Sequence, residues 1–130
     1  MPTSNETAIE RAYEAFGTGD MDAIRNESFA SGIQWEWPGT GPLGGHYDGI
    51  DAVLAMFVKL FEDSAGTFKV TPESISSFAD FVVVRSCASW TGKQGTYDDP
   101  YIQVFRMANG RASECMIHVN DMKLWDQFPA

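Results

Sequence analysis

The sequence has few positive charges, and this shortage narrows the possible partners. Nine Lys and Arg residues stand against eighteen Asp and Glu residues, which gives the chain of 130 residues a formal net charge of -9. An acidic balance is the opposite of the charge that phosphate backbones and anionic lipids attract. We therefore expect neither nucleic acid nor a membrane surface as a partner.

Cysteines and long apolar runs are also scarce. Cys87 and Cys115 lie in apolar, strand-like segments and are too few for a zinc cluster or a disulfide framework, so we expect small buried hydrophobic residues. No apolar run approaches the roughly 20 residues that span a bilayer, and residues 1–16 lack the basic and apolar regions of a signal peptide. The sequence predicts a cytoplasmic protein.

Apolar residues, by contrast, are plentiful. They make up 44% of the chain, and aromatic residues make up 13%, which is enough for a hydrophobic core without metal or disulfide support. The length fits one ordinary domain, which we assign to residues 1–130.

The first half of the chain predicts three helices. Residues 3–6 form a capping-box start, and apolar residues at helical spacing over 9–16 predict the first helix. Asp20 caps a shorter second helix that carries Phe29. Residues 50–61 predict a longer third helix because their apolar positions recur at a period of 3.6.

The rest of the chain predicts strands. Residues 33–37 alternate between apolar and polar, and the Gly- and Pro-rich residues 38–49 predict a loop. Four further β-rich segments lie near residues 68–78, 81–91, 97–107 and 112–120. Short turns join them, including Asn109-Gly110, so we predict sequential antiparallel strands. The fold class is α+β in the order α-α-β-α-β-β-β-β, with the helices on one face and a short closing helix near 122–128.

Four stretches in this order resemble the SnoaL-like and ketosteroid isomerase-related branch of the nuclear transport factor 2-like (NTF2-like) superfamily. They are YEAFGTGDMDAI, WPGTGPLGGHYDGIDAVLAMF, YIQVFRMANGR and IHVNDMKLW. The resemblance implies a cone-shaped, strongly curved antiparallel sheet wrapped around three helices. It also implies one apolar pocket at the wide end, a homodimer formed through the outer sheet face, and no cofactor or metal. The superfamily includes isomerases, cyclases, dehydratases, epoxide hydrolases and binding proteins, so function has to be argued from the pocket.

The catalytic positions of the steroid isomerases do not carry over to this chain. The tyrosine that donates to the substrate falls on Ala12, with Tyr13 one place away, and the general base falls on Trp37. The protonated aspartic acid falls on Gln103, which still donates a hydrogen bond through its amide. We therefore predict that the chain is not an authentic ketosteroid isomerase. The Asp-Arg-Asp relay of the epoxide hydrolases also has no convincing match.

The end of the last strand offers an acid/base candidate. The aspartate typical of the polyketide cyclases falls on Asn120, or on Asp121 if the register shifts by one residue. Met116, His118 and Asn120 share one strand face, whereas Ile117, Val119 and Asp121 share the other. If His118 faces the pocket, its ordinary pKa near 6.5 suits proton transfer at neutral pH. The alternative is a strand histidine hydrogen-bonded to the backbone.

Other candidate site residues come from the neighbouring strand, the helices and the glycine-rich loop. Tyr101 and Gln103 share one strand face, and the resemblance places that face toward the pocket, where they could hold a carbonyl or enol oxygen. Asp99 shares that face and is either a ligand contact or a solvated acid in a turn. His46 is either at the pocket mouth or in solvent. The pocket walls are predicted to include Tyr13, Trp37, Met56, Phe57 and Trp90.

Two functions of different classes follow from these residues. The first is a small cofactor-independent enzyme, isomerase-like or cyclase-like, that moves a proton on an apolar cyclic or polyketide-like carbonyl compound. His118, Gln103 and Tyr101 would be its catalytic residues, and Asn120 would orient the substrate. The alternative is a binding or accessory protein that has the pocket and no catalysis. A scaffold with a cavity closed by aromatic residues is a third possibility.

Overall fold

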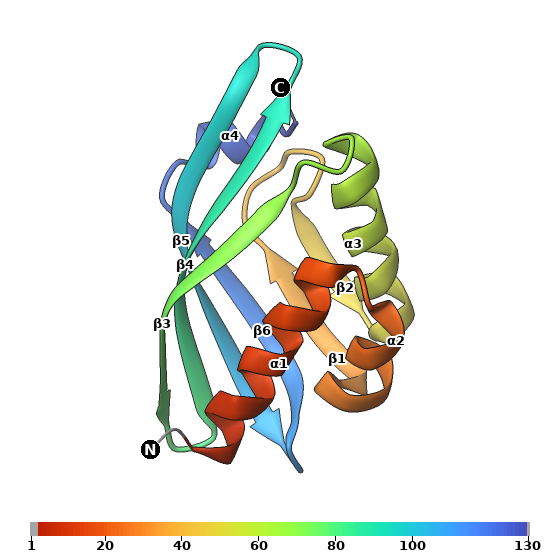
Figure 1. Cartoon of the computed structure of the whole chain (residues 1–130), viewed down its shortest axis with the longest axis vertical. Coiled ribbons are helices and arrows are strands. Elements are labelled where there is room, and N and C mark those ends of the chain that lie inside the picture. Colours follow the sequence, from red (N-terminus) through yellow and green to blue (C-terminus); the bar gives the residue numbers. More distant parts are fainter. Residues whose placement is uncertain (1–2, 130) are drawn as a thin grey trace.

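The computed structural model describes residues 3–129, which form one sheet and the helices that pack against it (Figure 1). The helices are α1 (Ser4–Thr18), α2 (Met21–Ala23), α3 (Ile50–Asp63) and α4 (Met122–Asp126), and a π-helical turn, Ile24–Ser28, follows α2. The strands are β1 (Phe29–Trp37), β2 (Gly45–Asp48), β3 (Lys69–Phe78), β4 (Phe81–Gly92), β5 (Gly95–Ala108) and β6 (Arg111–Val119). None of these helices is long and apolar enough to cross a membrane.

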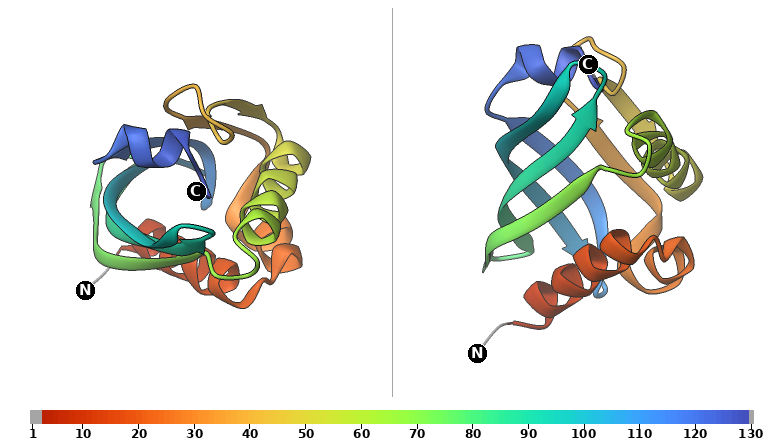
Figure 2. Two further views of the ribbon diagram at one scale, coloured as in Figure 1. Left: turned by 90° about the horizontal axis from the view of Figure 1, so that it is seen from above. Right: turned by 45° about the horizontal axis from the view of Figure 1, so that its top comes forward.

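The strands form one open sheet in the order β2-β1-β6-β5-β4-β3, and α1 and α3 cover its inner face (Figures 1 and 2). Side chains alternate along β5, so that residues such as Tyr101, Gln103 and Phe105 are buried while their neighbours are exposed or half-buried. The core lies between this face and the helices. The α+β class is confirmed, although the sheet is less curled than a cone.

The predicted caps and turns are confirmed. Thr3 accepts a hydrogen bond from the Glu6 amide at 3.1 Å, and Gly19 ends α1 in the left-handed region at φ 73°. Asn109 and Gly110 both have positive φ, as a two-residue hairpin turn requires, and β5 and β6 pair on either side of them.

Three details of the prediction are wrong, and each depends on a contact between distant segments. The glycine-rich loop contains β2, which pairs with β1 at Trp35 and Tyr47. Phe29 begins β1 instead of closing the second helix, because the chain passes through the π-helical turn. The sheet is also not purely antiparallel, since β1 runs parallel to β6. Local patterns do not contain these pairings because strand pairing is decided by tertiary context.

A buried carboxylate attaches α4 to the sheet. Asp99 is 2% exposed and accepts hydrogen bonds from the backbone amides of Asn120 and Asp121, the Asn120 side-chain amide and the Trp125 indole. The Trp125 bond is 2.8 Å long. Asp99 is therefore neither a solvated turn residue nor a pocket contact. It orders the segment between β6 and α4.

We expect Asp99→Asn to lower the free energy of unfolding by about 2 to 4 kcal/mol, because an amide cannot accept all four bonds and loses their charge assistance. Urea unfolding measures the change. Asp98→Asn is the matched control, because Asp98 is its exposed neighbour. An equal loss in both variants would contradict the role assigned to Asp99.

The outer face of the sheet carries exposed apolar side chains near its centre. Val83, Ile102 and Met116 are 37%, 42% and 47% exposed, and Val83 and Met116 both pair with Val104 between them. Adjacent exposed apolar residues are typical of an interaction surface. The homodimer stays a prediction, and this face is where we expect it.

We expect Met116→Lys to convert a homodimer into a monomer, because it would bury a charge at the centre of the contact. Val58→Lys is the control, since Val58 is 44% exposed on α3, away from this face. Size-exclusion chromatography with light scattering gives the masses. A wild-type chain that is monomeric at high concentration would reject the dimer.

Candidate ligand cavity

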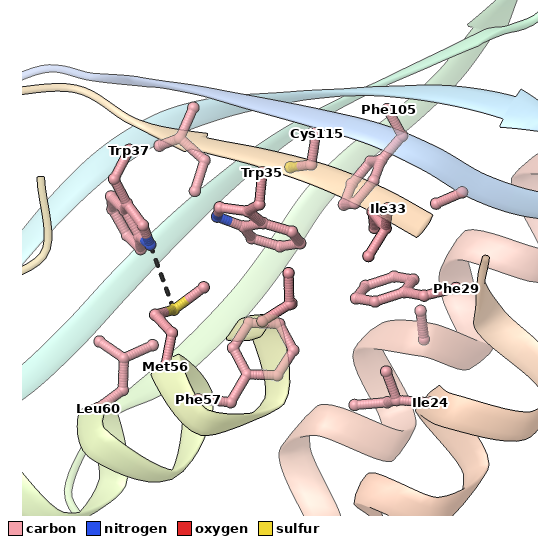
Figure 3. Close-up of a cluster of buried hydrophobic side chains, with 14 of the residues drawn as sticks. Ile24, Phe29, Ile33, Trp35, Trp37, Met56, Phe57, Leu60, Phe105 and Cys115 are labelled. Atoms are coloured by element: carbon pink, nitrogen blue, oxygen red, sulfur yellow. Dashed lines mark hydrogen bonds between the residues drawn. The ribbon is translucent and has the colours of Figure 1, made fainter. Parts of the chain in front are cut away.

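An aromatic cavity lies between the inner face of the sheet and the helices α1 and α3. Its volume is about 40 Å³, which accommodates water but no ring compound unless side chains move. The lining residues are mostly apolar, and they are Ala12, Tyr13, Phe16, Ile24, Phe29, Trp35, Trp37, Phe57, Leu60, Phe68, Val70, Tyr101, Gln103, Phe105 and Ile117. Figure 3 shows the part of this wall that β1 and α3 contribute.

The cavity approaches the surface between α1 and β3. Tyr13 and Phe16 on α1 and Val70 on β3 are the half-buried members of its lining, whereas the other lining residues are buried. At the opposite end, Trp125 of α4 packs on Trp37 with the ring centroids 5.2 Å apart. The resemblance implied an opening at the wide end of the sheet. In this structure α4 covers that end through the contact of Trp125 with Trp37.

One cluster of uncharged polar groups interrupts the apolar wall. The Gln103 side-chain oxygen accepts hydrogen bonds from the hydroxyls of Tyr13 and Tyr101, the latter at 3.2 Å. The Gln103 amide nitrogen in turn contacts Cys115 Sγ at 3.6 Å. Because α1 supplies Tyr13 and β5 supplies the other two, the cluster joins the helix to the sheet.

The cluster is uncharged at neutral pH. Burial raises the pKa of the Tyr13 and Tyr101 hydroxyls, and it raises the pKa of the Cys115 thiol. All three groups therefore retain their protons and act as neutral hydrogen-bonding groups. None of the fifteen described lining residues is Asp, Glu, His, Lys or Arg.

Two buried side-chain nitrogen or oxygen atoms of the described residues have no hydrogen-bond partner. They are Nε1 of Trp35 and Oγ of Ser86, which lies opposite Tyr101 on β4. The neighbouring indole differs, because Trp37 Nε1 donates to Met56 Sδ at 3.3 Å (Figure 3). Trp35 thus brings an unused donor into the cavity wall.

Several predicted site residues come together here. Tyr13, Trp37, Phe57, Tyr101 and Gln103 all line the cavity. Tyr101 and Gln103 share a strand face as alternation predicts, and the resemblance had placed that face and Trp37 toward the pocket. The roles of all five residues stay predictions.

His118 is not among them, and its predicted place in the pocket is wrong. Gln103 pairs with Ile117 and Tyr101 with Val119, so Ile117 and Val119 share the inner side of the sheet. His118 pairs with Ile102 between them and is exposed on the outer face. Period-two alternation allows no other outcome once this register forms.

The remaining candidates also lie outside the cavity lining. His46 is exposed on β2 beside Glu36, with which it forms an ion pair if protonated. Asn120 is exposed and bonds Asp99. Met56 lies behind Trp37, and Trp90 packs under α4 with its ring centroid 4.6 Å from that of Trp125.

Trp35 was expected in the pocket wall, but sequence reasoning missed its unpaired indole donor and the contact of Cys115 with Gln103. The alternation of Trp35 with Trp37 indicated that Trp35 faces inward, but it carried no information on the hydrogen-bond partner of the indole. Cys115 was correctly expected to be a buried hydrophobic residue. Its contact with Gln103 depends on the β5–β6 register, which appears only in the folded chain.

Solved structures share this fold over nearly the whole chain. The chain is similar to Bal32a from a soil-derived mobile gene cassette, with 28% identity, a TM-score of 0.91, and 96% of this chain and 95% of that chain covered. An NTF2-like protein of unknown function from Burkholderia pseudomallei has 22% identity and a TM-score of 0.81, with 98% and 99% covered. TerC, co-crystallised with polyporic acid, has 21% identity and a TM-score of 0.80, with 91% and 92% covered. No curated protein matches significantly.

The fold is therefore that of the NTF2-like superfamily. The family model described as the SnoaL-like domain matches residues 9–115, and the chain belongs to this family.

The buried tyrosines predict a loss of stability at alkaline pH. Their pKa is raised in the folded state, so the unfolded chain releases their protons first, above about pH 10. Their contribution is complete below about pH 10, and the free energy of unfolding then falls by about 1.4 kcal/mol per pH unit for each group. The contribution of the Cys115 thiol to the free energy of unfolding begins to fall at about pH 8.5, because burial raises its pKa in the folded state.

Urea unfolding between pH 8 and pH 11 measures this slope. We expect Tyr101→Phe to remove about 1.4 kcal/mol per pH unit from the slope above about pH 10. The same slope in the wild type and the variant would show that Tyr101 ionises equally in both states.

Proposed function

We propose that the chain binds a neutral, largely apolar cyclic carbonyl compound in this cavity. The observation that carries the proposal is an aromatic wall that contains one small set of buried, uncharged hydrogen-bonding groups. Small-molecule sites typically combine a mainly apolar lining with a few polar groups that orient the ligand. The polyporic acid found with TerC supports a small-molecule ligand for a chain of this fold.

The lining favours a neutral ligand. A carboxylate or an ammonium group would lose its hydration on entry and would meet no opposite charge among the described lining residues. The tyrosines remain protonated and supply no negative charge for a cation. A carbonyl oxygen, in contrast, needs only a neutral donor, which the cavity offers.

Binding is favoured over proton transfer because the lining offers no general base. Enolisation of a carbonyl compound requires a group that accepts a proton near neutral pH. His118 was the candidate, and it lies on the outer face. The Tyr13–Gln103–Tyr101 cluster contains donors and an amide oxygen, which is too weak a base to take a carbon-bound proton. We therefore assign the chain a binding or accessory role.

Ligand entry requires side chains to move, because the cavity holds only about 40 Å³. Tyr13 and Phe16 are the lining residues on α1 that already reach the surface. A ligand that enters between α1 and β3 needs to displace these two rings, and Tyr13 then gives up its bond to Gln103 and its edge-on contact with Phe105.

We expect 1-tetralone, a neutral bicyclic ketone, to bind at least about 30-fold more tightly than the matched anion 1,2,3,4-tetrahydronaphthalene-1-carboxylate. That ratio corresponds to about 2 kcal/mol, a low value for burial of an unpaired carboxylate. Isothermal titration calorimetry measures both affinities. Tighter binding of the anion, or no binding of the ketone at millimolar concentration, would reject the proposed ligand class.

The same ketone distinguishes a binding protein from an enzyme. We expect the protein not to accelerate exchange of the hydrogens next to the carbonyl for deuterium in D₂O, as followed by NMR. His118→Ala is expected to leave the affinity for 1-tetralone unchanged. Accelerated exchange that disappears in His118→Ala would restore the proton-transfer function.

A further inference from the structure

The donors in the cavity wall are not equally available to a ligand. The hydroxyl protons of Tyr13 and Tyr101 both point to the Gln103 oxygen, and Gln103 Nε2 donates to Cys115 Sγ. Trp37 Nε1 donates to Met56 Sδ. Trp35 is the described lining residue whose donor has no partner at all.

The unused donor of Trp35 is held inside the cavity. Trp35 is 3% exposed, and its ring packs on Phe57, Phe29 and Phe105, with centroid separations of 5.3, 5.8 and 6.1 Å. These contacts from three sides prevent the indole from turning to find a partner elsewhere. Figure 3 shows its nitrogen facing the gap between Trp37 and Phe57.

A buried donor without an acceptor is costly, and the cost disappears when an acceptor arrives. The cavity that Trp35 lines has a volume of about 40 Å³, which admits an oxygen atom, either that of a water molecule or that of a ligand. Ser86 Oγ is the other unpartnered atom, but Ser86 does not line the cavity. The tyrosine hydroxyls would first have to leave Gln103.

We propose that Trp35 Nε1 is the group that binds the carbonyl oxygen of the ligand. This inference rests on the proposed function and sharpens it. The carbonyl oxygen accepts the indole hydrogen bond on the β1 side of the cavity, and the Tyr13–Gln103–Tyr101 cluster keeps its own bonds and positions the opposite wall. The residue that selects a ketone over its hydrocarbon analogue is thus Trp35, not Tyr101 or Gln103.

The indole signals of the wild-type protein test this directly. The chain has four Trp residues, so a ¹H–¹⁵N spectrum contains up to four indole cross-peaks, each assigned by a Trp→Phe variant. We expect 1-tetralone to move the Trp35 Nε1–H proton signal downfield by about 0.5 ppm or more. Tetralin, which has the same rings without the oxygen, fills the cavity and is expected to cause no such downfield shift. The Trp37 signal is expected to move equally with both compounds.

A pair of variants gives the energetic test. We expect Trp35→Phe to lower the preference for 1-tetralone over tetralin by about three- to tenfold, which is the effect of one lost hydrogen bond. Trp37→Phe is the matched control, because it removes an indole from the same wall but leaves the preference at its wild-type value. The ratio of the two affinities cancels changes in packing that affect both compounds.

The outcomes separate the two proposals. If neither compound binds the wild-type protein, the proposed function fails. If 1-tetralone binds and the Trp35 proton does not move downfield, the function stands and the role of Trp35 is wrong. The second outcome does not need Trp35→Phe, because Trp→Phe variants of the other three tryptophans assign their own signals and leave the Trp35 signal by elimination.

Discussion

The pairing of β5 with β6 determines which side chains enter the cavity. Gln103 lies opposite Ile117 in this register, and Tyr101 lies opposite Val119. Because side chains alternate along each strand, this one alignment sends Tyr101, Gln103 and Ile117 to the helices and His118 to the outer face. A shift by a single residue would reverse all of these positions and would produce a different site. The function therefore depends on a backbone register more than on any single side chain.

The cavity that results is aromatic and uncharged. Burial keeps Tyr13, Tyr101 and Cys115 protonated, and Gln103 connects all three. Such a network holds polar groups in fixed positions at low cost, because each of its members has a partner. The exception is Trp35, whose packing prevents its indole from finding one. An interior of this kind suits recognition of a neutral oxygen and is poorly suited to taking up a proton.

The two ends of the cavity differ in how firmly they are closed. Four hydrogen bonds to Asp99 attach the α4 segment, and the Asp126 carboxylate accepts two backbone amides of the loop that faces it. On the other side, β3 is an edge strand with a register shift between Pro72 and Ser74. Tyr13 on α1 is held there by its bond to Gln103. Ser77 of β3 also bonds Glu6 and Thr3 at the start of α1, so we expect this side to open at the half-buried rings of Tyr13 and Phe16.

The sequence by itself determined the local elements and most of the core. The capping residues at Thr3, the Asn109-Gly110 turn and the alternation along β5 are short-range signals, because the atoms that satisfy them lie a few residues apart. They placed the helices and the hairpins, and they put Tyr101 and Gln103 on one face of the strand. Helical spacing likewise placed Tyr13 in the wall.

Tertiary structure decided what depends on distant partners. The parallel pairing of β1 with β6, the strand inside the glycine-rich loop and the outward position of His118 all follow from a register that no local pattern contains. The burial of Asp99 required α4 to pack on β5, and the missing partner of Trp35 required three aromatic rings from separate elements. Alternation predicts that two neighbouring residues on a strand point to opposite faces of the sheet. Only the packing of the helices on the sheet decides which of the two residues lines the cavity.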